Sequence, residues 1–138
     1  MTEMLIAAAA ISIVTLCAYM LYARGFIALN CLHALYYKCA APIGRHCSSW
    51  QAEFDMCSGM TRRSIRLVCG RTYPFTLSQS VARGAVYIDI VGKGGRIIAR
   101  LDVDNPSDTI ITEKCERLRI SVRFINAAGA CALSWQAD

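Results

Sequence analysis

Hydrophobic residues are distributed unevenly along this chain, and the longest run of them lies near its start. Residues 4–23 contain no charged side chain. At about 1.5 Å of rise per residue, a helix of this length spans roughly 30 Å, the thickness of the hydrocarbon core of a bilayer. Tyr19, Tyr22 and Arg24 lie at its C-terminal end, where aromatic and basic side chains meet lipid headgroups. The pattern predicts a transmembrane helix over residues 1–24 that serves as an uncleaved signal anchor.

A cleavable signal peptide is the alternative for the same residues. Such a peptide has a basic start, a shorter apolar stretch and small residues at its cleavage site. Here Glu3 is the only charged side chain before the stretch, and Leu21-Tyr22-Ala23 is a poor cleavage site. The sequence therefore favours a single-pass membrane protein over a secreted, disulfide-stabilised module with a cleaved N-terminus. Because Arg24 and Lys38 follow the helix, the positive-inside rule by itself places the rest of the chain in the cytoplasm.

Residues 25–60 predict a Cys-rich amphipathic helix and linker. Apolar residues from Phe26 to Tyr36 recur at helical spacing, so the helix is expected to continue to about Tyr37. Pro42 and Gly44 then end it.

From about residue 60 the hydrophobic period changes from 3.6 to 2. Leu118, Ile120, Val122 and Phe124 alternate with polar residues, which is typical of a half-buried strand. Residues 92–95, Gly-Lys-Gly-Gly, supply the positive φ angles of a tight hairpin. The expected strands are residues 64–68, 72–80, 85–91, 96–103, 108–112, 117–125 and 130–136. The prediction is a mainly β fold in which a small antiparallel β-sandwich of about seven strands occupies residues 61–138.

Composition adds a basic character to this domain. The chain is 55% hydrophobic and carries a net charge of +5, and residues 61–138 hold twelve Lys and Arg against seven Asp and Glu. The candidate binding residues for an anionic partner are Arg96, Arg100, Arg117, Arg119 and Arg123, which alternate with apolar residues along two strands. A strand face of this kind suits lipid headgroups or an anionic glycan. Nucleic acid is not expected, because no aromatic platform for base stacking accompanies the arginines.

Eight cysteines form the second unusual feature of the composition. No Cys-x-x-Cys pair occurs, so the spacing does not match a zinc finger. With Cys17 in the membrane, the disulfide candidates are Cys31, Cys39, Cys47, Cys57, Cys69, Cys115 and Cys131. A thiol-dependent redox or metal-binding protein that uses the middle cysteines stays open as an alternative function.

Oxygen-bearing side chains gather in one predicted loop. Asp102, Asp104, Asn105 and Asp108 are candidate calcium ligands, although the same residue types favour turns. No other cofactor is predicted. The predicted sandwich contains no histidine, no phosphate-binding loop and no nucleophile elbow, so we expect a protein that is not an enzyme.

Four short motifs carry a family resemblance over residues 64–137. They are Gly70-Arg71-Thr72-Tyr73-Pro74-Phe75, Val86-Tyr87-Ile88-Asp89, Gly95-Arg96-Ile97-Ile98-Ala99 and Gly129-Ala130-Cys131-Ala132-Leu133-Ser134-Trp135. Together they resemble the prepeptidase C-terminal (PPC) jelly-roll modules of bacterial secreted proteins. The chain departs from that pattern at Cys131, where an aromatic residue is usual, and at Cys115-Glu116-Arg117, which replaces a Gly-rich turn.

The resemblance implies a noncatalytic, extracytoplasmic binding module, in conflict with the charge rule. We follow the resemblance on this point. The leading hypothesis is a membrane-anchored β-sandwich with a bilayer and a protein or anionic glycan as partners.

Overall fold

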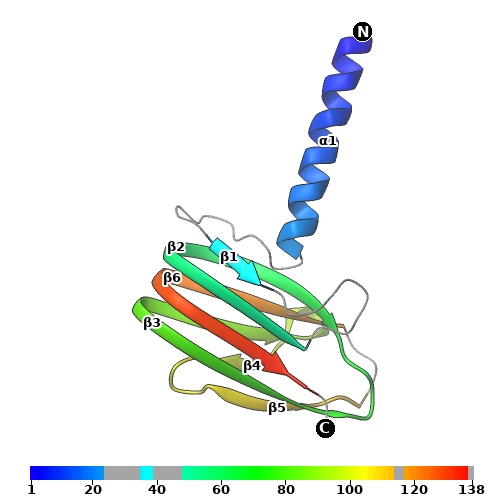
Figure 1. Ribbon diagram of the computed structural model, residues 1–138. Helices are drawn as coiled ribbons and strands as arrows, with labels where there is room; N and C mark the ends of the chain where they lie inside the picture. The colour runs from blue at the N-terminus through cyan, green and yellow to red at the C-terminus, as the bar shows by residue number, and fades with distance from the viewer. Residues whose placement is uncertain (24–34, 39–47, 114–116, 137–138) are drawn as a thin grey trace.

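The computed structural model describes residues 1–23, 35–38, 48–113 and 117–136. Helix α1, Thr2–Ala23, stands away from the rest of the chain, with its C-terminal end next to strand β2 (Figure 1). The side chains of residues 2–21 are exposed, and the helix is long and apolar enough to cross a membrane. The two hydroxyl groups in its middle are satisfied within the helix, since Ser12 Oγ donates to the Ala8 carbonyl at 2.8 Å and Thr15 Oγ1 to the Ile11 carbonyl at 2.8 Å.

The rest of the described chain is an antiparallel β structure of six strands. They are β1 (Leu35–Lys38), β2 (Ser49–Arg66), β3 (Thr72–Val91), β4 (Ile97–Leu101), β5 (Ser107–Ile111) and β6 (Arg117–Trp135). Hydrogen bonding runs in the order β1-β2-β6-β3-β4, and β5 pairs with β3. The predicted mainly β class with an apolar N-terminal helix is confirmed.

Three of the strands are long because each one bends and continues. The pairing of β2 with β6 is irregular between Phe54 and Gly59, and that of β3 with β6 between Val81 and Ala85. Unusual backbone angles mark the bends, with φ of 45° at Met56, 76° at Gly84 and 48° at Asn126. The irregularities lie side by side across β2, β6 and β3, so the sheet folds over along one line.

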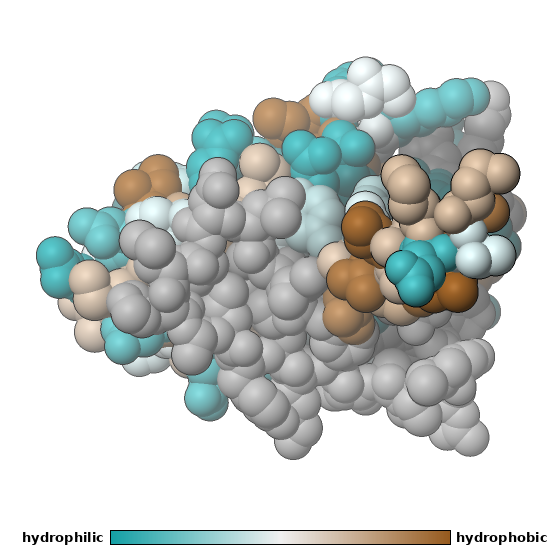
Figure 2. Space-filling view, turned by 90° about the horizontal axis from the view of Figure 1, so that it is seen from above, coloured by the Kyte–Doolittle hydropathy of each residue, from teal (hydrophilic) through white to brown (hydrophobic). Residues whose placement is uncertain are grey.

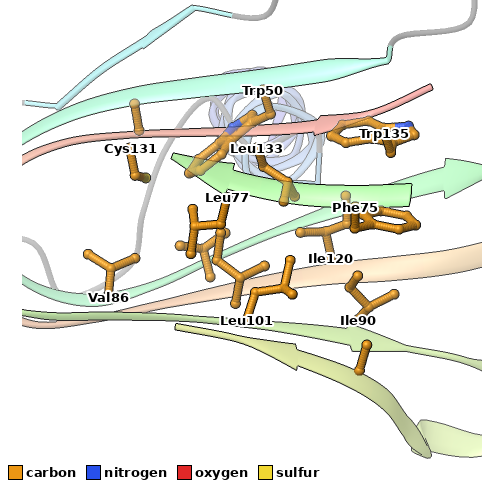
Figure 3. Packing of buried hydrophobic residues seen from close by; sticks show 14 of the residues in the cluster. Trp50, Phe75, Leu77, Val86, Ile90, Leu101, Ile120, Cys131, Leu133 and Trp135 are labelled. Carbon is orange, nitrogen blue, oxygen red and sulfur yellow. The ribbon is translucent and has the colours of Figure 1, made fainter. Parts of the chain in front are cut away.

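Folding along this line produces two layers (Figure 1). The front layer contains β1, residues 49–54, 129–135 and 72–81, and β5; the rear layer contains residues 59–66, 117–124 and 85–91, and β4. Buried side chains from both layers meet between them, as Figure 3 shows for Leu77 and Leu133 from the front and Ile90 and Ile120 from the rear. Phe75 is fully buried and stacks on Trp135 with ring centroids 5.9 Å apart.

The strand breaks expected at residues 81–84 and 126–129 are therefore bends within single strands. Predicted segments 72–80 and 85–91 are the two halves of β3, and segments 117–125 and 130–136 are the two halves of β6. Glycines mark both places, because Gly84 and Gly129 take positive φ without ending the hydrogen bonding. The tight connection expected at residues 92–95 is confirmed, and it joins β3 to its antiparallel partner β4.

The prediction for residues 25–60 needs a correction. Leu35–Lys38 is a strand rather than the end of an amphipathic helix, and residues 49–60 belong to β2 rather than to a linker. Trp50, Ala52 and Phe54 are buried and alternate with exposed Gln51 and Glu53, which is strand periodicity. Residues 24–34 and 39–47 lie outside the described part of the chain, and the predicted domain division stays a prediction.

Candidate functional site

The outer face of the rear layer carries a concentration of arginines, which we call the arginine face. It consists of Arg62, Arg66, Arg100, Arg117, Arg119 and Arg123. Alternation places these side chains outward, because Ile65, Leu118, Ile120 and Val122 point into the core. Along β6, the span from Arg117 to Arg123 is about 20 Å at the usual rise of a strand. The arginine face is thus a row of regularly spaced cations on a rigid sheet.

The charges on this face are poorly compensated. Arg66 lies directly opposite Arg117 in the β2–β6 register, an arrangement that disfavours folding through like-charge repulsion. Asp89 is the only acidic residue in the four strand segments of the rear layer. It binds Arg100 through two contacts, Nε to Oδ1 at 2.6 Å and Nη2 to Oδ2 at 3.1 Å. This pairing raises the pKa of Arg100, and no carboxylate among the described residues forms an ion pair with the other five arginines of the arginine face.

Arg62 adds an unsatisfied donor to the arginine face. It lies opposite Ser121 and is half-buried. Its Nε atom is buried and has no hydrogen-bond partner within the described structure. Because an unpaired buried donor is unfavourable by roughly 1–3 kcal/mol, an acceptor supplied from outside would relieve it.

Not all of the predicted basic residues lie together. Arg117, Arg119 and Arg123 share the arginine face with Arg100, but Arg100 is already paired. Arg96 lies at the end of the sandwich, where it lines a crevice with Lys93 and Glu113.

Sequence reasoning missed Arg62 and Arg66. Arg66 stands between the buried residues Ile65 and Leu67, so strict alternation there could have revealed it. The alternation around Arg62 is obscured by Arg63, and only the pairing with β6 places it on the face.

The outer face of the front layer carries small and polar side chains instead of arginines. Three strands run side by side there, and in register they place Gln51, Ala132 and Ser78 in one row and Glu53, Ala130 and Ser80 in the next. The small alanines on β6 form the floor of a depression of about 440 Å³, and the longer polar residues of β2 and β3 form its walls. We call this depression the β6 groove.

The acidic loop residues act as turn formers. Asp102 Oδ1 accepts hydrogen bonds from the backbone N–H groups of Asp104 at 3.0 Å and Asn105 at 2.8 Å, and Asp108 Oδ1 accepts one from Thr109 at 2.7 Å. Asn105 Nδ2 donates to the Arg100 carbonyl at 3.0 Å. In the described part of the chain, no three His, Cys, Asp or Glu side chains are grouped as metal ligands. Calcium binding stays a prediction that this geometry does not favour.

Three of the seven disulfide candidates lie in the described residues. Cys57 and Cys131 are buried and Cys69 is exposed. Cys31, Cys39, Cys47 and Cys115 lie outside the described residues, as do both histidines, so the disulfide, redox and metal alternatives for the middle of the chain stay predictions. Burial raises the pKa of the Cys131 thiol to about 12, so this thiol is protonated and unreactive at neutral pH.

The buried Cys131 thiol predicts a specific alkaline destabilisation. Between its ordinary pKa of 9.0 and its folded value of about 12, the unfolded chain loses the thiol proton while the folded chain keeps it. The free energy of unfolding therefore falls as pH rises above 9, with a limiting slope of about 1.4 kcal/mol per pH unit. In urea titrations at pH 8 and 11, the stability advantage of the wild type over Cys131→Ala should shrink at the higher pH. An advantage that is equal at both pH values would contradict this assignment.

Comparisons with known proteins return the fold alone. No family model and no curated protein sequence matches the chain. A periplasmic inhibitor of g-type lysozyme from Aeromonas hydrophila, PliG, superposes with a TM-score of 0.48 and 13% identity, over 70% of this chain and 91% of that one. TmCBM61, solved in complex with β-1,4-galactotriose, superposes with a TM-score of 0.46 and 13% identity, over 83% of this chain and 95% of that one. The function is therefore argued from the residues of this chain.

Proposed function

We propose that this protein is a membrane-anchored, noncatalytic β-sandwich binding module that holds an anionic glycan on its arginine face. The observation that carries the proposal is that Arg62, Arg66, Arg117, Arg119 and Arg123 lie on one face with no ion pair to a carboxylate among the described residues. Like charges placed opposite one another lower stability, so their arrangement on one face is better explained by an anionic partner than by folding. The resemblance to PPC modules, which are extracytoplasmic, is part of the same proposal.

Helix α1 supports the anchoring part of the proposal. Its 22 residues span about 33 Å as a helix, and the one acidic side chain, Glu3, lies in the first turn. Seen from above, hydrophobic side chains gather where the helix points toward the viewer (Figure 2). An exposed apolar surface of this size is unfavourable in water and favourable in lipid. The anchor would hold the sandwich close to a membrane surface on its extracytoplasmic side.

The geometry of the arginine face favours a linear polymer with repeated charges. Residues 117, 119 and 123 project from one side of one strand, at separations of about 7 and 13 Å. A chain of sugar carboxylates or sulfates lying along β6 can contact these guanidinium groups in turn, and guanidinium binds both anions through paired hydrogen bonds. Nucleic acid also has repeated charges, but Tyr87 is the only aromatic residue with a place in the outward rows of this face, and it is half-buried. The arginine face therefore offers almost no aromatic surface on which nucleic-acid bases could stack.

The test is binding of a fluorescent sulfated dextran to the full chain in phosphatidylcholine nanodiscs. Charge reversal at the centre of the row, Arg119→Glu, should weaken binding about tenfold or more at low salt, because it replaces an attraction by a repulsion. Asp89→Asn should strengthen binding, because it releases Arg100 from its carboxylate partner. Raising the salt concentration should weaken binding of the wild type steeply.

The matched control is Arg83→Glu, which changes the net charge equally. Arg83 is exposed at the bend of β3, away from the row on β6. We expect its effect on binding to stay within about twofold at moderate salt, where distant charges are screened. Equal weakening by both variants would show that net charge alone attracts the polymer and would overturn the arginine face as a site. If a single-stranded DNA of equal charge bound more tightly than the sulfated dextran, the assignment of the ligand as a glycan would be overturned.

A further inference from the structure

We infer a second binding site in the β6 groove, on the face opposite the arginines, and assign it to a neutral saccharide. The groove lies on the front layer, and the arginine face lies on the outer side of the rear layer, so the two sites are separated by the core (Figures 1 and 3). One ligand of ordinary size cannot occupy both. The groove is consequently independent of the proposed function of the arginine face.

The shape of the groove follows from residue size in three paired strands. Ala130 and Ala132 on β6 present only methyl groups, whereas Gln51 and Glu53 rise on one side and Ser78 and Ser80 on the other. Strands lie about 4.8 Å apart, so the two walls are about 10 Å from each other across the floor. This width admits one sugar ring, and the volume of about 440 Å³ lies in the range of small-molecule sites.

The polar groups of the walls are available to a ligand. Among the described residues, the side chains of Gln51, Glu53, Ser78 and Ser80 make no hydrogen bond or ion pair with one another or with a neighbour. They offer two hydroxyl groups, one amide and one carboxylate, a set that both donates and accepts hydrogen bonds.

This chemistry selects a neutral, hydroxyl-rich ligand. A sugar ring has hydroxyl groups around its edge for the polar walls and C–H groups on its faces for the alanine floor. Among the described residues that line the groove, Glu53 is the only charged one, and it would repel a carboxylate, sulfate or phosphate. The preference of the groove is thus opposite to that of the arginine face.

The experiment uses the full chain in phosphatidylcholine nanodiscs and four neutral probes, namely the β-linked tetrasaccharides of glucose, galactose, mannose and N-acetylglucosamine. Binding is measured by saturation-transfer NMR and by microcalorimetry. We expect at least one probe to bind the wild type. Ala132→Leu fills the floor of the groove without entering the core, because Ala132 points outward between the buried residues Cys131 and Leu133, and it should weaken that binding at least tenfold. Glu53→Gln, which preserves the shape of the wall, should change affinity by a smaller factor of about three to ten.

The matched control is Ser64→Leu, an outward substitution on the arginine side of the sandwich. It should leave saccharide binding unchanged, while Ala132→Leu should leave sulfated-dextran binding unchanged. Near-ultraviolet circular dichroism of both variants verifies the fold, and a groove variant that loses it is replaced by Ala130→Val. The inference is overturned if none of the four probes binds, or if binding survives in a folded groove variant. Failure of the dextran experiment alone would leave the groove in place, so the two proposals fail separately.

Discussion

Gly84→Ala is expected to destabilise the sandwich by more than about 3 kcal/mol, a large part of the stability of a domain of this size. Gly84 has a φ of 76° at the bend of β3. A Cβ atom built on it would overlap the backbone carbonyl oxygens of Ile125 and Asn126 on β6. Since these atoms belong to the main chain of the facing bend, they cannot turn away as a flexible side chain could, and the two strands must separate. Urea unfolding followed by the fluorescence of buried Trp50 and Trp135 measures the loss.

Gly94→Ala supplies the matched control. Gly94 has almost the same φ, 75°, but a Cβ atom there would meet nothing within 4 Å. Its replacement therefore incurs only the backbone cost of a left-handed alanine, about 1–2 kcal/mol. The difference in stability loss between the two variants measures the effect of the close approach of β3 and β6 at the bend of the sheet. Equal losses of stability would show that this approach is not what fixes the bend.

The bend of the sheet also explains which parts of the fold could be predicted from the sequence and which could not. Alternation identified the inward residues of β6, because each strand half is a simple two-residue repeat against one core. The sequence predicts strand ends at residues 80 and 125, and a glycine between two alternating segments most commonly marks a turn. Only the pairing across β2, β6 and β3 shows that the chain continues through both bends, and such pairing is a long-range property that local patterns do not contain.

The binding surfaces were predictable to different degrees. The arginines of β6 were found because they share one strand, and strand alternation alone puts them on one face. The β6 groove could not be found in this way, since its floor and its two walls come from three strands that are far apart in sequence. Apart from Glu53, the residues of its floor and walls are alanine, serine and glutamine, none of which individually indicates a binding site. The groove exists only because the register sets two alanines between two polar walls.

The two proposed sites, the arginine face and the β6 groove, differ in the charge of the ligand proposed for each and lie on opposite sides of one core. Both sites consist of strand residues supported by the same core, so neither needs a loop to become ordered on binding. Binding at one face should accordingly leave the affinity of the other unchanged, apart from weak long-range electrostatics.

The proposed membrane anchor predicts the second large effect, for the variant Ile11→Arg/Val14→Arg. Both side chains are exposed in the middle of α1, with 67% of each accessible. An arginine at the centre of a membrane helix disfavours insertion by about 2.5–3.5 kcal/mol, and the two replaced residues also lose their own contribution. Carbonate extraction of cell membranes should leave the wild type in the membrane fraction, with the full mass of 15.2 kDa by mass spectrometry. The variant should move largely to the soluble fraction.

Tyr22→Arg/Ala23→Arg adds the same two charges at the end of α1 and should remain membrane-bound. Arginines there reach the headgroups beside Arg24, so insertion is disfavoured little. If the wild type were recovered as a shortened soluble chain, α1 would be a cleaved signal peptide and the secreted alternative would hold. If the central variant stayed in the membrane after extraction, the sandwich rather than the helix would make the attachment. The position of the charges along α1, rather than their number, is therefore what decides between an anchor and a surface contact.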